Sequence, residues 1–371
     1  MSALELSRLT AQLLWAVFAL GVLLGVVGQR SRFCTMGAVA DVVNMGDWTR
    51  LRMWAMSIGL AVLGFNAMVA AGLVQAGQSI YGGNRVLWAS AAVGGALFGV
   101  GMVLASGCGS RNLVRLGAGS LKSLVVLLVL GLSAWATLRG VTAVLRVATV
   151  DQLVVTLPVA QDLPSLLARA SGLPVRSLAA GLGLLLGGGL LAWSLASAEA
   201  RQAGPLLGGL GTGAAVLGVW WVSGVAGFLP EHPETLEPTY LASASQRMEA
   251  LSFVGPVAQG LEWLVFYSDS SRHLSLGVAA IAGVVLGAYL TAKRQREFRF
   301  ESFRDAADLS RHLIGAVLMG VGGVTALGCT VGQGISGVST LGLTSLVALA
   351  GIVLGALAGL RLLGWLLDRE A

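Results

Sequence analysis

The sequence predicts an all-α polytopic membrane protein. Of its 371 residues, 56% are apolar and only 11% are charged, against roughly 25% charged in soluble domains. The mean hydropathy is +0.81. Glycine is the second signal, because 53 residues is about twice the usual ~7%, and glycine lets helices approach closely or break inside a bilayer. These observations exclude a soluble globular protein.

Nine apolar runs approach the ~20 residues that cross a bilayer as a helix. A tenth segment, residues 250–266, is shorter and contains Pro256, Gln259 and Glu262, so we expect a re-entrant element surrounded by protein or water. We expect one transmembrane domain over residues 1–371. The nine predicted spans are residues 9–28, 53–74, 86–106, 121–138, 175–198, 206–227, 274–292, 313–328 and 341–366.

The loops predict the orientation and account for the net charge of +6. Residues 293–304 contain five Lys or Arg and are expected in the cytoplasm. Residues 228–246 contain Glu231, Glu234 and Glu237 but no Lys or Arg, which places them outside. Nine spans then leave the N-terminus outside and the C-terminus in the cytoplasm. Because the excess charge lies in such loops, we expect no nucleic-acid partner.

An internal repeat contains all three cysteines. Residues 25–34, 99–108 and 320–329 each begin with Gly-Val and end at Cys34, Cys108 or Cys329. Residues 218–227 match more weakly, with Gly227 at the cysteine position. Each unit is a span, a glycine-rich break and a returning span. We therefore expect one half at about residues 9–138, a connector helix at about 175–198, and a second half of opposite topology at about 206–366, an arrangement typical of transporters.

The breaks predict an anion path. A helix that starts inside a membrane leaves free N–H groups, which attract anions, and basic residues such as Arg30 and Arg115 add positive potential. A thiol with an ordinary pKa of about 8.5 is mostly neutral at pH 7, so it can donate a weak hydrogen bond to a negative ligand. Secondary candidates in the breaks are Arg32, Gly107, Gly109, Arg111, Asn112, Gly328, Gly332 and Gln333.

Three motifs resemble the YeeE/YedE sulphur-transport family. They are R-S-R-F-C-T-M-G-A-V-A-D at residues 30–41, S-G-C-G-S-R-N-L at 106–113 and L-G-C-T-V-G-Q-G at 327–334. The resemblance implies a bacterial inner-membrane protein that takes up thiosulfate through an hourglass-like central path. It also implies that Cys34, Cys108 and Cys329 relay the anion by S–H···S hydrogen bonds, and that a small cytoplasmic sulfur-carrier protein is a partner. Membrane lipid is the other partner that we expect.

Other interpretations remain open at this point. The cysteines can be small core residues or a redox pair, whereas a metal site is disfavoured because only Asp41 offers another ligand nearby. We predict no metal and no cofactor. A membrane sulfurtransferase or redox protein would need a base beside a nucleophilic cysteine, but all three histidines lie outside the motifs. We therefore predict a transporter rather than an enzyme, and a selenium compound is the alternative cargo. Energy coupling and oligomeric state stay open.

Overall fold

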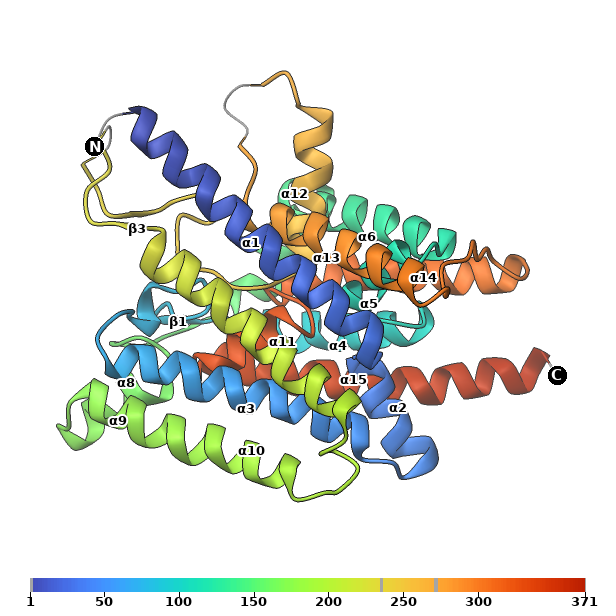
Figure 1. The fold of residues 1–371 in the computed structure, drawn as a ribbon, viewed down its shortest axis with the longest axis horizontal. Coiled ribbons are helices and arrows are strands. Elements are labelled where there is room, and N and C mark those ends of the chain that lie inside the picture. Colours follow the sequence, from blue (N-terminus) through green and yellow to red (C-terminus); the bar gives the residue numbers. More distant parts are fainter. Residues whose placement is uncertain (1–2, 234–235, 270–272, 371) are drawn as a thin grey trace.

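The computed structural model describes residues 3–233, 236–269 and 273–370, so Glu234 of the acidic loop lies outside the described residues. Within them the chain is a helical bundle with two short two-stranded sheets (Figure 1), which confirms the all-α polytopic class. Eight helical segments are long and apolar enough to cross a membrane: Leu4–Met45, Thr49–Ala70, Trp88–Gly117, Leu121–Arg139, Val175–Leu195, Ala203–Ala226, Leu276–Arg294 and Leu343–Leu366.

The first part of the bundle contains two interrupted helices. A break after α1 separates it from α2, and a break after α4 separates it from α5, so each cysteine motif lies between two helical pieces. Helices α3 and α6 are the returning spans. The bounds are α1 Ala3–Ser31, α2 Thr35–Met45, α3 Thr49–Ala70, α4 Trp88–Leu104, α5 Gly109–Gly117 and α6 Leu121–Arg139.

The middle of the chain contains a small two-stranded sheet and the helical span predicted at residues 175–198. Strands β1 (Arg85–Val86) and β2 (Val155–Thr156) pair antiparallel, with α4 to α7 between them in the chain. The span consists of α9, a π-helical turn at Gly183–Gly187, and α10, and it packs along α3. Leu184 and Leu185 are each 69% exposed, as expected of a helix that faces lipid. The helix bounds are α7 Val141–Ala148, α8 Leu163–Ser171, α9 Val175–Leu182 and α10 Gly188–Leu195.

The last part again contains interrupted helices. Helix α11 ends in a π-helical turn at Val222–Ala226, and a second π-helical turn at Gly332–Gly337 follows the break after α14. Strands β3 (Phe228–Leu229) and β4 (Thr239–Tyr240) pair antiparallel. The helix bounds are α11 Ala203–Trp221, α12 Val254–Val265, α13 Leu276–Arg294, α14 Ala306–Thr325 and α15 Leu343–Glu370.

Two helices, α14 and α12, are not among the eight candidate spans. Helix α14 occupies the predicted span 313–328, but Asp308, Arg311 and His312 in its first two turns make it less apolar than the other eight segments. Lys122 Nζ at the start of α6 lies 2.7 Å from Asp308 Oδ2, so this polar end has a charged partner. Helix α12 has 12 residues and is about 18 Å long. It is too short to cross a hydrocarbon core of about 30 Å.

The helix contacts of the first part of the chain recur in the last part. Helix α1 packs on α13 as α11 packs on α3, and α4 packs on α15 as α14 packs on α6; α1 also contacts α11, and α4 contacts α14. Glycines permit the closest approaches. A methyl group built on Gly25 would overlap the backbone oxygen of Val284, and one on Gly99 would overlap that of Ile352. The bundle is therefore held by backbone-to-backbone contact between spans.

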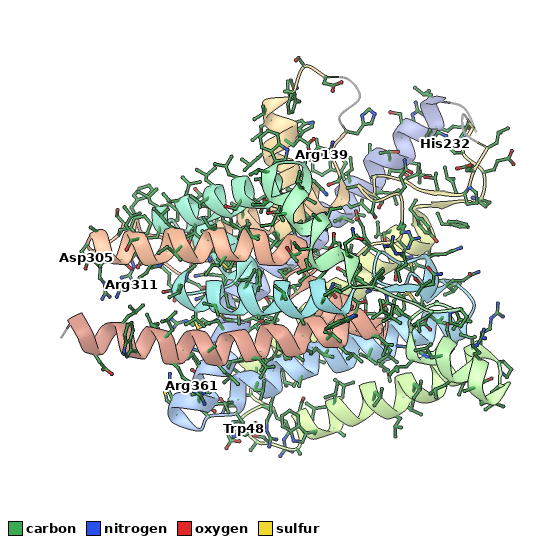
Figure 2. The ribbon with its side chains drawn as sticks, turned by 180° about the vertical axis from the view of Figure 1, so that it is seen from behind. Trp48, Arg139, His232, Asp305, Arg311 and Arg361 are labelled. Atoms are coloured by element: carbon green, nitrogen blue, oxygen red, sulfur yellow. The ribbon has the colours of Figure 1, made fainter. Side chains whose placement is uncertain are left out.

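The bundle has two distinct ends (Figure 1). We call the end that carries β1 to β4 the hairpin end; there the bridge between Ser79 and Met248 joins the two long loops. The opposite end, which carries residues 293–304 and the C-terminus, is the basic-loop end. Figure 2 shows Arg311 and Arg361 at the basic-loop end and His232 at the hairpin end.

Candidate functional site

Each cysteine lies at the start of a short helical element. Cys34 is the N-cap of α2, and its Sγ accepts a hydrogen bond from the Gly37 N–H at 3.4 Å. Cys329 Sγ accepts one from the Gly332 N–H, also at 3.4 Å. Cys108 is the N-cap of α5, with its Sγ 3.2 Å from Ser110 Oγ. All three are buried free thiols, and they replace the oxygen side chains that usually cap helices.

The fold brings the three cysteines into one cluster. The side chains of Cys34 and Cys108 interact directly, and Thr330 lies beside Cys108. Cys329 lies close enough to Cys108 for an electrostatic interaction. Its thiol also accepts hydrogen bonds from the backbone N–H groups of Phe253 and Val331. Four interrupted helices thus contribute to the centre of the bundle, through α2, α5, α12 and the turn after α14.

The repeat is also visible in the backbone. Arg32, Ser106 and Leu327 each lie two residues before a cysteine, and their φ angles are 53°, 54° and 59°. A non-glycine residue in this left-handed region costs roughly 1–2 kcal/mol. The same strained conformation at the same position of all three motifs indicates that the turn is required to aim each cysteine and the helix that follows it.

A small cavity lies between the motifs. Its volume is about 20 Å³, which is room for about one water molecule. The residue before Cys34 and residues just after Cys108 and Cys329 line it, namely Phe33, Ser110 and Val331, together with Thr212 from α11. The constriction of the bundle is therefore narrow and bounded by the three cysteine motifs.

Unpartnered donors surround this constriction. The hydroxyl oxygens of Thr35, Thr212 and Thr330 and the indole nitrogen of Trp54 are buried and have no hydrogen-bond partner among the described residues. Thr35 and Thr330 directly follow cysteines, and the ring of Trp54 lies beside Gly334. Buried polar groups normally have partners. Four neutral donors left without one near the constriction favour a ligand that passes there.

The polar side chains around the Cys108 motif bind backbone carbonyls. Asn112 Nδ2 donates to the carbonyls of Gly107 and Cys108 at 3.0 and 3.2 Å, and Arg115 Nη1 donates to that of Ser106 at 2.8 Å. They satisfy carbonyls that the break leaves free. Arg111 on α5 is partly buried, and its guanidinium lies 3.5 Å from the Gly28 carbonyl, beside the cavity.

The other candidates are placed as follows. The Arg32 side chain is 68% exposed and lies 3.9 Å from Glu297, so it faces away from the cluster. Gly328 packs against Gln333, Gly332 against Ser252, Gly107 against Arg111, and Gly109 near Phe253. A side chain at Gly332 would overlap Ser252, so this glycine permits the close approach of the loop before α12.

A polar cavity at the hairpin end leads toward the cluster. Its volume is about 200 Å³. Arg85 of β1 and Arg247 of the loop before α12 line it. Gln333 and Ser345 also line it, and each leaves an oxygen without a partner among the described residues. Gln333 belongs to the Cys329 motif. The sequence motifs did not point to Arg85 or Arg247, because both lie outside them along the chain.

Fold and site together define a multi-pass membrane transporter whose interrupted helices meet at a buried thiol cluster. The sulphur-transport family model matches residues 30–358, and the chain belongs to that family, as the motifs predicted. It is 28% identical to the thiosulfate transporter TsuA of Escherichia coli (strain K12) over 335 residues, 90% of each chain. It is 27% identical to the thiosulfate transporter TsuA of Spirochaeta thermophila over 334 residues, 86% of this chain and 90% of the relative.

Proposed function

We propose that this protein takes up thiosulfate across the bacterial inner membrane, with Cys34, Cys108 and Cys329 as a relay of neutral donors. One observation carries the proposal: residues of all three cysteine motifs line a cavity of about 20 Å³, and nearby buried donors have no partner among the described residues. The two relatives are named as thiosulfate transporters over nearly their whole length, which supports the cargo and fits a protein that is not an enzyme.

Charge along the bundle supports an anion path. Arg85 and Arg247 lie in the cavity at the hairpin end, which attracts an anion from that side. Arg111 lies beside the constriction on α5, which runs to the basic-loop end. Among the described residues that line the constriction cavity, the side-chain donors are the hydroxyls of Ser110 and Thr212 rather than cations. A neutral donor holds an anion less tightly than a desolvated cation would, so the anion can leave as well as enter.

The opposite ends of thiosulfate suit different donors here. Its terminal sulfur is soft and polarizable and matches the thiols, whereas its oxygens match the hydroxyls of Thr35, Thr212 and Thr330. Such hydroxyls lose their hydration in the fold without gaining a partner among the described residues, so they gain a hydrogen bond when the anion arrives. This would favour thiosulfate over an anion that lacks the sulfur end.

The packing supports two inverted halves. Exchanging α1, α3, α4 and α6 for α11, α13, α14 and α15 leaves the set of helix contacts unchanged. We propose halves at about residues 9–138 and 206–366, with 175–198 as the connector that inverts the second half. The basic-loop end is then cytoplasmic, the N-terminus is outside, and a small sulfur-carrier protein would receive the anion at the cytoplasmic side.

Uptake into liposomes tests the cargo. Purified protein is reconstituted, and uptake of ³⁵S-labelled thiosulfate is measured against protein-free liposomes, with unlabelled thiosulfate, sulfate, selenite or selenosulfate as competitors. We expect competition by thiosulfate and selenosulfate, which share a soft terminal atom, and little by sulfate. Equal competition by sulfate would contradict the role of the thiols. Stronger competition by selenite than by thiosulfate would assign a selenium cargo instead.

A further inference from the structure

An apolar groove runs along the side of the bundle at the basic-loop end. Its volume is about 590 Å³, and it lies between the end of α5, the start of α6, one face of α13 and the loop residues 298–300. Leu121, Leu286 and Phe300 line it and are 44%, 39% and 76% exposed. We call it the α5–α13 groove.

The mouth of the groove is fixed by backbone hydrogen bonds. The Arg299 N–H donates to the Ala118 carbonyl at 3.2 Å, and the Leu121 N–H donates to the Glu301 carbonyl at 2.9 Å. The rings of Tyr289 and Phe298 meet edge to face with centroids 5.6 Å apart. The loop is thus attached to the turn between α5 and α6, and the groove is formed before anything binds.

Lys293 and Arg299 belong to the helix and the loop that form this mouth. Lys293 Nζ lies 3.4 Å from Tyr289 Oη and 5.6 Å from the ring centroid, and Arg299 lies between the lining residues Phe298 and Phe300. Neither forms an ion pair within the described part of the chain, whereas the nearby Glu297 is paired with Arg32 at 3.9 Å. The mouth therefore has an excess of positive charge for an outside anion.

The depth of the groove indicates what fills it. Its lining extends along α13 from Ala282 to Tyr289, and Lys293 follows one turn later. From Ala282 to Lys293 the helix rises by about 16 Å, so the far end lies inside the hydrocarbon core, below the interface where the charges lie. A soluble protein cannot reach that depth, but an acyl chain can.

We propose that the α5–α13 groove binds an anionic phospholipid, with one acyl chain along α13 and the phosphate headgroup on Lys293 and Arg299. Basic clusters immediately beside a span are the usual recognition element for anionic lipids. The lipid also contacts Leu116 and Gly117 of α5, the half-helix that begins at Cys108. It would therefore support the element that positions the central thiol.

The test measures lipid binding and does not depend on transport. The full chain is purified in detergent, incubated with equal amounts of phosphatidylglycerol and phosphatidylcholine that have identical acyl chains, and analysed by native mass spectrometry. We expect at least about fivefold more bound phosphatidylglycerol. Lys293→Gln with Arg299→Gln should remove this preference. Arg304→Gln with Arg361→Gln should retain it. This control removes the same charge at the basic-loop end, because Arg304 belongs to the 293–304 loop and Figure 2 shows Arg361 at that end.

A second variant tests the groove itself. Leu286→Trp puts a larger side chain into the lining and should lower the retention of both lipids, while size-exclusion chromatography confirms folding. Equal binding of the two lipids by the unmodified protein would overturn the proposal, as would a preference that survives Lys293→Gln with Arg299→Gln. If a soluble protein covered this face instead, neither lipid would be retained, which also overturns it.

Discussion

The thiols of Cys34 and Cys108 are close enough to interact, although each residue is the N-cap of a different half-helix. Two interrupted helices therefore end at one point, and the Cys329 motif meets them there. This contact has consequences for transport, for backbone conformation and for the packing that holds the helices in place.

Thr212 provides a test of the neutral donors. Its hydroxyl is fully buried, has no partner among the described residues and faces the constriction cavity. Thr212→Val keeps the shape but removes one hydrogen bond of about 1 kcal/mol. We expect about fivefold weaker apparent affinity for thiosulfate in liposome uptake, with Thr212→Ser close to the unmodified protein. Thr325→Val is the control, because that hydroxyl already donates to the Val321 carbonyl of its own helix at 2.8 Å. Equal effects at both sites would argue against a ligand at Thr212.

The strained turn before Cys108 gives a stability prediction. Ser106 has a φ of 54°, a conformation that glycine adopts readily and β-branched residues adopt poorly. Ser106→Gly should change the free energy of unfolding by less than about 1 kcal/mol, whereas Ser106→Val should lower it by about 1–3 kcal/mol. Thermal unfolding in detergent measures both. A Val variant as stable as the Gly variant would show that the turn is not held in this conformation.

The close contact of α1 with α13 predicts opposite effects for two glycine substitutions. A methyl group at Gly25 would overlap the Val284 backbone oxygen, whereas Gly189 has open space around it. We expect Gly25→Ala to lower stability by about 1–3 kcal/mol and Gly189→Ala to raise it by up to about 1 kcal/mol, because alanine favours helix. Thermal unfolding of the two variants measures both changes in stability. Stability changes of the same sign in both variants would contradict the close packing of α1 on α13.

Glu249, in the loop before α12, predicts a pH dependence. Burial raises the pKa of Glu249 to about 7, while hydrogen bonds from the Ala244 N–H and Ser245 partly oppose this. Because the folded state holds the proton more tightly than the unfolded state, stability falls as the pH rises from about 4.5 to about 7. Unfolding temperatures at pH 5 and pH 8 should therefore differ less in Glu249→Gln than in the unmodified protein. If the two proteins showed the same difference in unfolding temperature between pH 5 and pH 8, a group other than Glu249 would be responsible for the pH dependence.

Local signals in the sequence predicted most of the fold. Apolar length located the spans, and the Gly-Val to Cys frame located the breaks before α2, α5 and the turn at Gly332. The frame did not locate the fourth half-helix. Gly227 occupies the cysteine position in the weaker match, but α12 begins only after Phe253, because a long loop with β3 and β4 intervenes.

The sequence predicts those site residues that belong to a repeated motif. It does not predict those that reach the site only through helix packing. The cysteines are marked by their repeated frame. Thr212 is an ordinary threonine in an apolar helix, and only the crossing of α11 with the other motifs places it at the cavity. Arg32 lies in a motif, yet its backbone turn directs the side chain outward to Glu297. Side-chain direction in an interrupted helix depends on such turns, which composition does not encode.

Thiosulfate uptake by the Cys108→Ala variant tests the central claim most directly. Cys108 is the cysteine that lies next to both Cys34 and Thr330. In reconstituted liposomes we predict uptake at least about tenfold below that of the unmodified protein, because a donor to a desolvated anion is lost. Ser194→Ala, which removes a hydroxyl on α10 that is as buried as the Cys108 thiol, should transport normally. Undiminished uptake by correctly folded Cys108→Ala protein would contradict the thiol relay.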